Sequence, residues 1–318
     1  MPQYNKTQIA TAAVKYGFLR DTFEKVLRLK KVLEFFNQEE LLSQHLALKG
    51  GTAINLTIFN LPRLSIDIDV DYIPNDSRKD MLCTREKITE TIQDYMMDEG
   101  YSLSDNSRFS HSLDAFNFQY LNCGGNREML KIEINYSLRS HVLEPESRMI
   151  LTEAFAKPVF VLTVHPAEIF AAKANALISR AAARDLYDFN NFIRAGLFSD
   201  QKDLLRKTII FYATVSAKTV NRNFNLSAID TLDFGKIRRD LFPVLTRREA
   251  TDNFELDYLK DNVKTYLKTL MTVTPLEDEY MEKFINGEYC PELLFSDKAI
   301  LDRIKNHPMA LWKCKAER

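Results

Sequence analysis

The sequence predicts an α+β protein, with an N-terminal domain whose mixed sheet is flanked by helices and a mostly helical C-terminal domain. Two observations predict it. Runs in which apolar and polar residues alternate with a period of two, as in β-strands, all lie before residue 165. Apolar residues spaced three and four apart, as in amphipathic helices, dominate after it. We therefore expect one domain at residues 1–165, with a helical lead, and a second at residues 166–318.

Composition narrows the class of protein. The chain has 318 residues, of which 45% are apolar and 27% charged, as in proteins with a packed core. Its formal net charge of -1 means that a nucleic-acid partner would need a local basic face. Cys83, Cys123, Cys290 and Cys314 form no CxxC pair, so neither zinc nor a disulfide framework is expected. Without a signal core or a long apolar run, we expect a cytoplasmic protein with no membrane partner.

The elements follow in order along the chain. Residues 7–36 predict one long helix, and EELLSQHLALKGG predicts a shorter helical stretch that reaches the first glycine pair. IDIDVDYI predicts a strand. A helix then follows, with Ser77 as its N-cap and Gly100 as its stop. AFNFQYLN and MLKIEINYSL predict two strands joined by the turn NCGGNRE, and PVFVLTV leads into a helix with Pro166 in its first turn.

The stretch SIDIDVDY places three aspartates on one face of its strand. Asp67, Asp69 and Asp71 are spaced about 6.5–7 Å apart, while Ile68 and Val70 point to the opposite face. Such like charges repel one another unless cations screen them. Two carboxylates at this separation can hold divalent cations in a two-metal site, and Mg²⁺ suits a set of carboxylates, waters and phosphate oxygens.

Two other interpretations of the three aspartates compete with a magnesium site. A solvated edge strand would carry such an acidic face without any ligand. A calcium loop also begins DxDxD, but it requires glycine at its sixth position and glutamate at its twelfth. Tyr72 and Arg78 occupy those positions, so an EF-hand is excluded.

A glycine pair lies shortly before the aspartates, in LKGGTAINL. Gly50 and Gly51 let backbone N–H groups approach a phosphate, and a helix beginning at Thr52 would aim its positive end at the same anion. The pattern is not a Walker P-loop. Alone it could equally be a helix C-cap and a turn, but followed by an acidic strand it predicts a phosphate cradle beside a metal site.

A third carboxylate would complete the metal site. In MLKIEINYSL, Glu133 shares a face with Lys131 and Asn135, opposite Ile132 and Ile134. A solvated strand glutamate is the alternative. Glu133 rests on this strand pattern alone.

These motifs together resemble the AbiEii/AbiGii-type nucleotidyltransferase toxins of the polymerase-beta-like nucleotidyltransferase superfamily. The pattern G-G-[ST], a spacer and R-x-S-x-D-x-D is matched by Gly50, Gly51, Thr52, Arg63, Ser65, Asp67 and Asp69. The family's helix with a lysine, followed by R-D-x-x-D, is matched in EIFAAKANALISRAAARDLYD by Glu168, Lys173, Arg180, Arg184, Asp185 and Asp188. The C-terminal NHPMALWK also resembles the tail of many members, so the resemblance extends over most of the chain.

The resemblance implies roles for these residues. Asp67 and Asp69, with Glu133, are expected to hold Mg²⁺, for which Mn²⁺ can substitute. The residues expected to bind the nucleotide are Gly50, Gly51, Thr52, Arg63, Ser65, Arg180 and Arg184. Lys173 is expected to stabilise the triphosphate, with Asp185 or Asp188 orienting it.

The spacing of the residues in the lysine and R-D-x-x-D motif predicts where they lie around a helix. In one continuous helix, Lys173, Arg180, Arg184 and Asp188 would fall within one sector, which predicts a cationic face for the triphosphate. A merely solvated cationic stripe is the alternative. Asp185 directly follows the motif arginine and is favoured as the residue that orients Lys173, although Asp188 would lie closer to the lysine's face.

The expected activity is transfer of a nucleoside monophosphate from an NTP to an acceptor, and the 3′ end of transfer RNA is the leading candidate. Nucleotidylation of a protein is one alternative. A nucleotide-binding regulatory module without catalysis is another, but the presence of both Asp67 and Asp69 favours the enzyme. The resemblance further implies a toxin of a toxin–antitoxin or phage abortive-infection system, with a cognate antitoxin encoded nearby.

Overall fold

The computed structural model describes residues 5–151, 158–217 and 220–316, and it divides into two compact units. The sheet unit comprises Met1–Arg139, Pro145–Val164 and Phe242–Thr251. The helical unit comprises Ser140–Glu144, His165–Leu241 and Asp252–Arg318. Within the described ranges, no helix combines the length and the apolar character that a membrane crossing requires.

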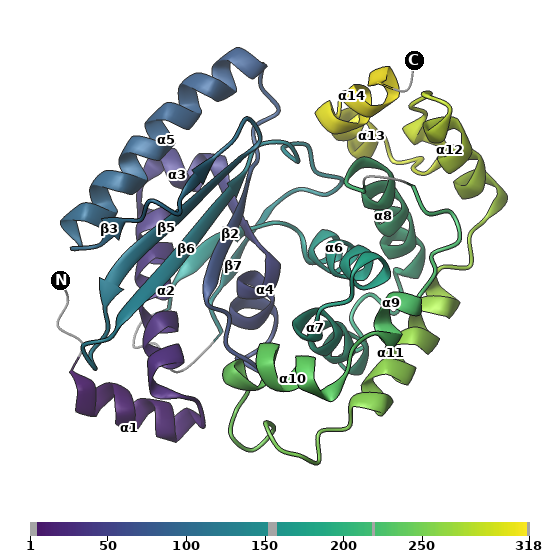
Figure 1. Ribbon diagram of the computed structural model, residues 1–318. Coiled ribbons are helices and arrows are strands. Elements are labelled where there is room, and N and C mark those ends of the chain that lie inside the picture. The colour runs from purple at the N-terminus through teal and green to yellow at the C-terminus, as the bar shows by residue number, and fades with distance from the viewer. Residues whose placement is uncertain (1–4, 152–157, 218–219, 317–318) are drawn as a thin grey trace. The chain divides into compact units, whose positions relative to one another are not determined.

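The sheet unit contains a mixed sheet and its flanking helices (Figure 1), as predicted. Its helices are α1 (Lys6–Tyr16), α2 (Arg20–Gln38), α3 (Glu40–His45), α4 (Gly50–Ala53), the π-helical η1 (Ile54–Ile58), α5 (Arg78–Asp98) and the short η2 (Phe242–Val244). Its strands are β1 (Leu46–Lys49), β2 (Asp67–Tyr72), β3 (Ser102–Leu103), β4 (Arg108–Phe109), β5 (Leu113–Leu121), β6 (Arg127–Asn135), β7 (Glu146–Met149) and β8 (Phe160–Thr163).

The strand order is β3-β5-β6-β2-β1-β8-β7, and β4 also pairs with β5. The β2–β6 and β1–β8 pairs are parallel, and the others are antiparallel. Strand β2, which carries the aspartates, is therefore an inner strand, so a solvated edge strand does not account for its acidic face.

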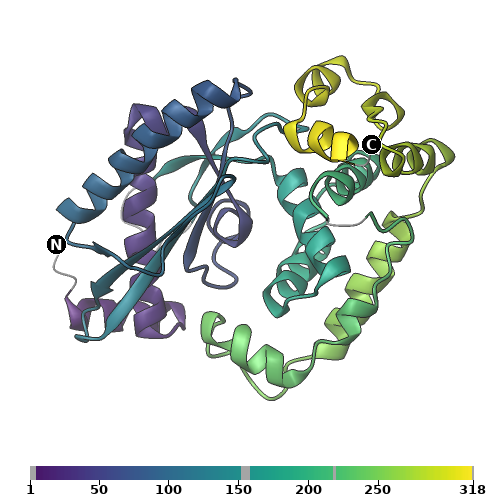
Figure 2. The same cartoon turned by 45° about the horizontal axis from the view of Figure 1, so that its top comes forward.

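Helices α2 and α5 cover one face of the sheet, and α4 lies on the other side of β2 in both views (Figures 1 and 2). Arg28 of α2 lies over the ring of Tyr120, 4.3 Å from its centroid, and Nε of Arg85 in α5 donates to Asp114 at 2.9 Å. Tyr120 and Asp114 share one face of β5, because they are an even number of residues apart. The opposite face of the sheet is thus left for the aspartates.

Two predicted helices at the N-terminus were wrong in detail. The helix expected over residues 7–36 is two helices, because Gly17 (φ 77°) caps α1 in the left-handed conformation. The stretch EELLSQHLALKGG is a helix followed by strand β1. Its apolar run Leu46, Ala47 and Leu48 is buried in the inner strand between β2 and β8, and such a short run does not distinguish helix from strand.

The helical unit consists of α6 (Pro166–Ser179), α7 (Ala183–Arg194), α8 (Lys202–Val215), α9 (Ser227–Asp230), α10 (Phe234–Asp240), α11 (Leu256–Leu270), α12 (Pro275–Ile285), η3 (Pro291–Leu293), α13 (Lys298–Ile304) and α14 (Pro308–Ala316). Pro166 is at the first turn of α6, as predicted. Aromatic rings of Phe170, Phe189, Phe192 and Tyr266 pack together from α6, α7 and α11.

The helix that the second motif was expected to form is interrupted. Helix α6 ends at Ser179, Ala181 adopts a positive φ of 43°, and α7 begins at Ala183. The single-sector arrangement of Lys173, Arg180, Arg184 and Asp188 is therefore wrong, since residues on two helices no longer share one helical period.

Candidate active site

The glycine turn lies directly against the acidic strand. Gly50 begins helix α4 with φ 68°, in the region that favours glycine, and Lys49 precedes it as N-cap. A Cβ atom added to Gly50 would lie 2.7 Å from Oδ2 of Asp69. Helix α4 begins at Gly50, two residues before the predicted start at Thr52, because it follows strand β1 with no residue between them.

Gly51 makes a similar approach to the rest of the first motif. A Cβ atom there would lie 2.7 Å from Nη2 of Arg63 and 3.0 Å from Oγ of Ser65. Nδ2 of the buried Asn55 donates to the Gly51 carbonyl at 2.8 Å. The structure therefore brings the glycine pair and the R-x-S-x-D-x-D stretch together in space.

Two of the residues expected to bind nucleotide are deeply buried. Arg63 is 1% exposed, and its Nη1 donates to the carbonyl of Leu64 at 2.9 Å. Thr52 is fully buried, and its hydroxyl donates to the carbonyl of Asp67. Both side chains thereby fix the backbone that presents the motif, and Thr52 links α4 to the first aspartate.

The acidic face extends across β2 and β6. Their parallel register pairs Asp67 with Lys131 and Asp69 with Glu133, and Lys131 Nζ lies 2.9 Å from Glu133 Oε2. Burial raises the pKa of Asp69 to about 6, and Glu133 and Asp67 add to the rise while Lys49 and Lys131 oppose it.

Asp71 stands apart from the other two aspartates. It is 3% exposed, and its carboxylate forms an ion pair with Lys49. Asp71 is therefore neutralised by a residue of the protein, whereas burial disfavours the charged form of the Asp69 carboxylate.

The donor set suits a divalent cation. Asp67 and Asp69 project from the same strand face, and burial, with added repulsion from Glu133 and Asp67, raises the pKa of Asp69. Across the described ranges, no three His, Cys, Asp or Glu side chains already converge as a ligand cluster. Glu133 is engaged by Lys131, so its role as a third ligand stays a prediction.

The second motif forms its own cluster in the helical unit. Nζ of Lys173 lies 2.6 Å from Oδ1 of Asp185 and 3.0 Å from Oδ2 of Asp188. The Lys173 side chain is 12% exposed, Asp185 is 6% exposed and Asp188 is fully buried. Both aspartates therefore contact the lysine, so the structure does not single out Asp185, the favoured residue, as the one that orients it.

The two motif arginines differ in their surroundings. Arg180 is at the C-cap of α6 with its side chain 74% exposed, and its Nη2 lies 3.9 Å from Oδ2 of Asp185. Nε of Arg184 donates to the carbonyl of Asp240 at 2.8 Å. Arg180 keeps a guanidinium that a ligand in solution can reach.

The sequence pattern did not single out every residue that shapes these clusters. Lys49 lies opposite Asp69 in the β1–β2 register, and only its position beside Gly50 hinted at a role. The motif residue Glu168 accepts hydrogen bonds from the backbone N–H of Leu143 at 2.6 Å and from the Tyr212 hydroxyl, and lies 3.2 Å from Nδ1 of His141. Glu168 thereby anchors the segment Ser140–Glu144, which follows β6.

Comparisons with known proteins first define the class. The whole chain resembles the solved structure of MenT4, a nucleotidyltransferase toxin from Mycobacterium tuberculosis H37Rv, with a TM-score of 0.65 over 99% of each chain and 15% sequence identity. At this identity the likeness shows that the two proteins share a fold. No curated protein matches the chain by sequence.

The family is shown by a second comparison. Residues 33–284 match the model of the nucleotidyl transferase AbiEii toxins of type IV toxin–antitoxin systems. The chain belongs to this AbiEii family, which confirms the predicted nucleotidyltransferase toxin of a toxin–antitoxin system, and the family model adds that the system is of type IV. Membership implies an NTP substrate and a cognate antitoxin.

Proposed function

We propose that this toxin transfers a nucleoside monophosphate from an NTP to the 3′ end of an RNA, with transfer RNA as the acceptor, in a Mg²⁺-dependent reaction in the cytoplasm. The observation that carries the proposal is the approach of Gly50 to the Asp69 carboxylate. A turn that admits phosphate oxygens beside paired carboxylates is what nucleotide transfer requires.

In this proposal the sheet unit binds the reacting groups. Backbone N–H groups at Gly50 and Gly51 contact the triphosphate, and the buried Arg63 and Thr52 hold that turn in place. Asp67 and Asp69, with Glu133, hold the metal ion. When bound, the ion neutralises charge on the phosphates and on the developing pyrophosphate.

The helical unit supplies the second motif to the same reaction. Lys173 lies within ion-pair distance of Asp185 and Asp188, and an ammonium ion at a phosphate oxygen stabilises the leaving group. Arg180 and Arg184 add positive charge. The acceptor hydroxyl oxygen forms a bond to the α-phosphorus, the bond from that phosphorus to the bridging oxygen breaks, and pyrophosphate and the hydroxyl proton are released.

The test is incubation of the purified chain with each α-labelled NTP, Mg²⁺ and total RNA, followed by separation of RNA from protein on gels. We expect one NTP to label RNA of transfer-RNA length, with no labelling when Mg²⁺ is chelated. Label on protein would instead identify a protein-nucleotidylating enzyme, and no covalent label with retained NTP binding would identify a regulatory module.

A further inference from the structure

A row of side chains crosses five neighbouring strands at the level of Asp69. The register pairs Lys49 with Asp69, Asp69 with Glu133, Glu133 with Ala115, and Ala115 with Arg108. Paired residues on adjacent strands project from the same face of a sheet. Arg108 therefore lies on the face of the carboxylates, where it is exposed.

The same face continues from this row toward the turn between β5 and β6. Lys131 pairs with Asn117 and Met129 pairs with Gln119, and Arg127 follows at the end of β6. Lys131 retains 38% exposure of its side chain, Met129 is 41% exposed, and Arg127 is exposed. The inner positions of β6 point to the other face, where Leu130 and Ile132 are fully buried.

The geometry of in-line displacement indicates from which side of β2 the acceptor approaches. Strand β1, which leads into the glycine turn, flanks β2 on one side, and β6 flanks it on the other. The attacking and leaving oxygens lie on opposite sides of the phosphorus in such reactions. With the triphosphate at Gly50 and Gly51, as proposed above, we place the approach of the acceptor on the opposite side of β2 from β1, across β6 and β5.

The side chains on that path have the chemistry of a single-stranded RNA site. Cations bind phosphates, amides hydrogen-bond to base edges, and exposed apolar groups pack on base faces. We propose that the 3′ end of a single-stranded RNA acceptor lies along this face, named here the acceptor strip, which consists of Arg108, Asn117, Gln119, Arg127, Met129 and Lys131.

Charge favours RNA as the occupant. The chain as a whole has a net charge of -1, so attraction for a polyanion must be local. Three of the six strip residues are cations, of which Arg108 and Arg127 are exposed and Lys131 is paired with Glu133 at 2.9 Å. The nearest acidic residue of the same hairpin turn, Glu128, alternates to the other face and pairs with Lys25 of α2 at 3.1 Å.

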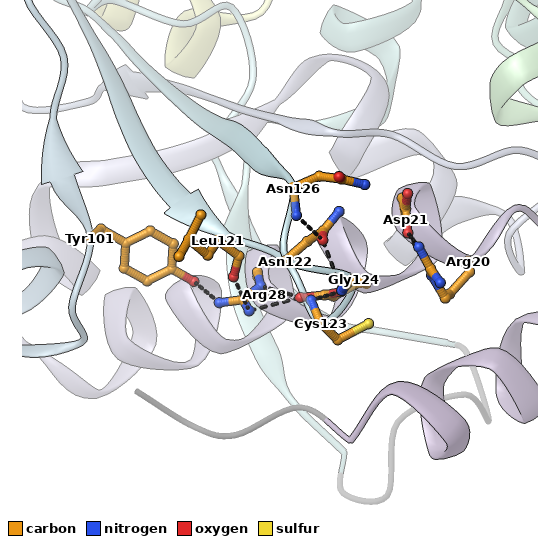
Figure 3. A network of polar contacts seen from close by, with 10 residues as sticks. Arg20, Asp21, Arg28, Tyr101, Leu121, Asn122, Cys123, Gly124 and Asn126 are labelled. Atoms are coloured by element: carbon orange, nitrogen blue, oxygen red, sulfur yellow. Dashed lines mark hydrogen bonds and ion pairs between the residues drawn. The ribbon is translucent and has the colours of Figure 1, made fainter.

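The turn between β5 and β6, which precedes Arg127, is held by polar contacts with α2 and Tyr101 (Figure 3). The buried Arg28 donates to Leu121 O at 3.4 Å and to the Tyr101 hydroxyl at 3.3 Å, and Glu24 accepts from the backbone N–H of Cys123 at 2.9 Å. The turn closes on itself where Gly124 N–H donates to Asn122 Oδ1 at 2.9 Å. Binding groups that start in a fixed position lose less entropy when a flexible strand binds.

The proposal rests on the proposed function, and its test separates the two. Anisotropy measures binding of a fluorescent single-stranded RNA, and of the same sequence as a blunt duplex, to the full chain over a range of salt concentrations. The variant is Arg108→Glu/Arg127→Glu. Its matched control is Lys79→Glu/Lys87→Glu, which reverses two exposed cations on α5 across the sheet. Met129→Ala is matched with Met97→Ala, which is 57% exposed on α5.

We expect Arg108→Glu/Arg127→Glu to weaken single-strand binding on the order of tenfold or more and to reduce the salt slope by about 1.4, since each phosphate contact on a single strand contributes about 0.7. Met129→Ala should weaken binding severalfold, and both controls should bind as wild type. Binding of a fluorescent NTP analogue should not change in any variant.

Wild-type affinity for RNA in the double variant, with RNA still labelled in the transfer assay, would overturn the strip and leave the proposed function standing. If wild type neither binds nor labels RNA, the RNA-transferring function fails and the strip with it. Tighter binding of the duplex than of the single strand would also contradict the strip.

Discussion

Gly50 and Asp69 approach each other so closely that no side chain fits between them: a Cβ atom on Gly50 would lie 2.7 Å from the Asp69 carboxylate. The glycine pair and the aspartates, which are separate in sequence, thus lie together in one site. This contact makes the first prediction specific.

Gly50→Ala should abolish nucleotide transfer. Its φ of 68° costs an alanine about 1–2 kcal/mol, and the new methyl group displaces the Asp69 carboxylate. Gly196→Ala is the matched control, because Gly196, which follows α7, has φ 63° with no atom within 4 Å of an added Cβ. Thermal denaturation should show strain in both variants, and only Gly50→Ala should lose transfer. Equal activity of the two would remove Gly50 from the site.

Asp67→Ala/Asp69→Ala should abolish transfer and relieve growth arrest when the toxin is expressed without its antitoxin. Losing the paired carboxylates removes transition-state stabilisation of several kcal/mol. Asp94→Ala/Asp98→Ala, on the exposed face of α5, is the control with the same change of charge. Growth curves at matched expression check the prediction, and arrest by the Asp67/Asp69 variant would mean that toxicity is independent of transfer.

The stability of the metal-free protein should depend on Asp69. Its pKa of about 6 exceeds the unfolded value of 3.8, so the folded state binds the proton more tightly and its free energy of unfolding falls as pH rises through 4 to 6. Asp69→Asn should therefore be more stable than wild type at pH 7, by on the order of 2–3 kcal/mol, and the gain should vanish below pH 4.

Urea denaturation in EDTA at both pH values measures this difference. Adding Mg²⁺ at pH 7 should stabilise wild type and leave Asp69→Asn nearly unchanged. A constant difference between the two proteins from pH 4 to pH 7 would contradict the raised pKa.

Lys173→Met should cost both activity and stability. It leaves the carboxylates of Asp185 and Asp188 buried without the lysine that both contact, and breaking such a pair costs about 3–5 kcal/mol. The triple variant Lys173→Met/Asp185→Asn/Asp188→Asn should recover much of the stability and none of the transfer. Chemical denaturation and the transfer assay together separate the two effects, and transfer by the triple variant would exclude this cluster from catalysis.

Alternation was the most reliable guide to this fold. The strands around Asp69 and Glu133 were predicted because each buries one face, which leaves a period of two in the sequence. The helix predicted over LALK was wrong because an inner strand buries both faces and loses that period. The break between α6 and α7 at Ala181 could not be predicted, because no glycine or proline lies there and the segment SRAAARD has a helical pattern throughout.

In the site, too, some features leave a pattern in the sequence and others do not. Residue types and spacing predicted the aspartates and the glycine pair, and the family resemblance predicted Lys173. The pairing of Lys49 with Asp71 and the inward turn of Thr52 toward the Asp67 carbonyl depend on register and on tertiary contacts, which one sequence does not record.

The interleaving of the two units constrains how the toxin is made. Phe242–Thr251 belongs to the sheet unit, where Val244 accepts a hydrogen bond from the backbone N–H of Leu64, beside the motif residues Arg63 and Ser65, at 2.7 Å. A nascent chain still lacking this segment cannot finish the sheet unit, although all its strands have left the ribosome. Synthesis of most of the polypeptide therefore precedes the first moment at which the nucleotide site is complete, and a ribosome that stalls earlier releases no finished toxin.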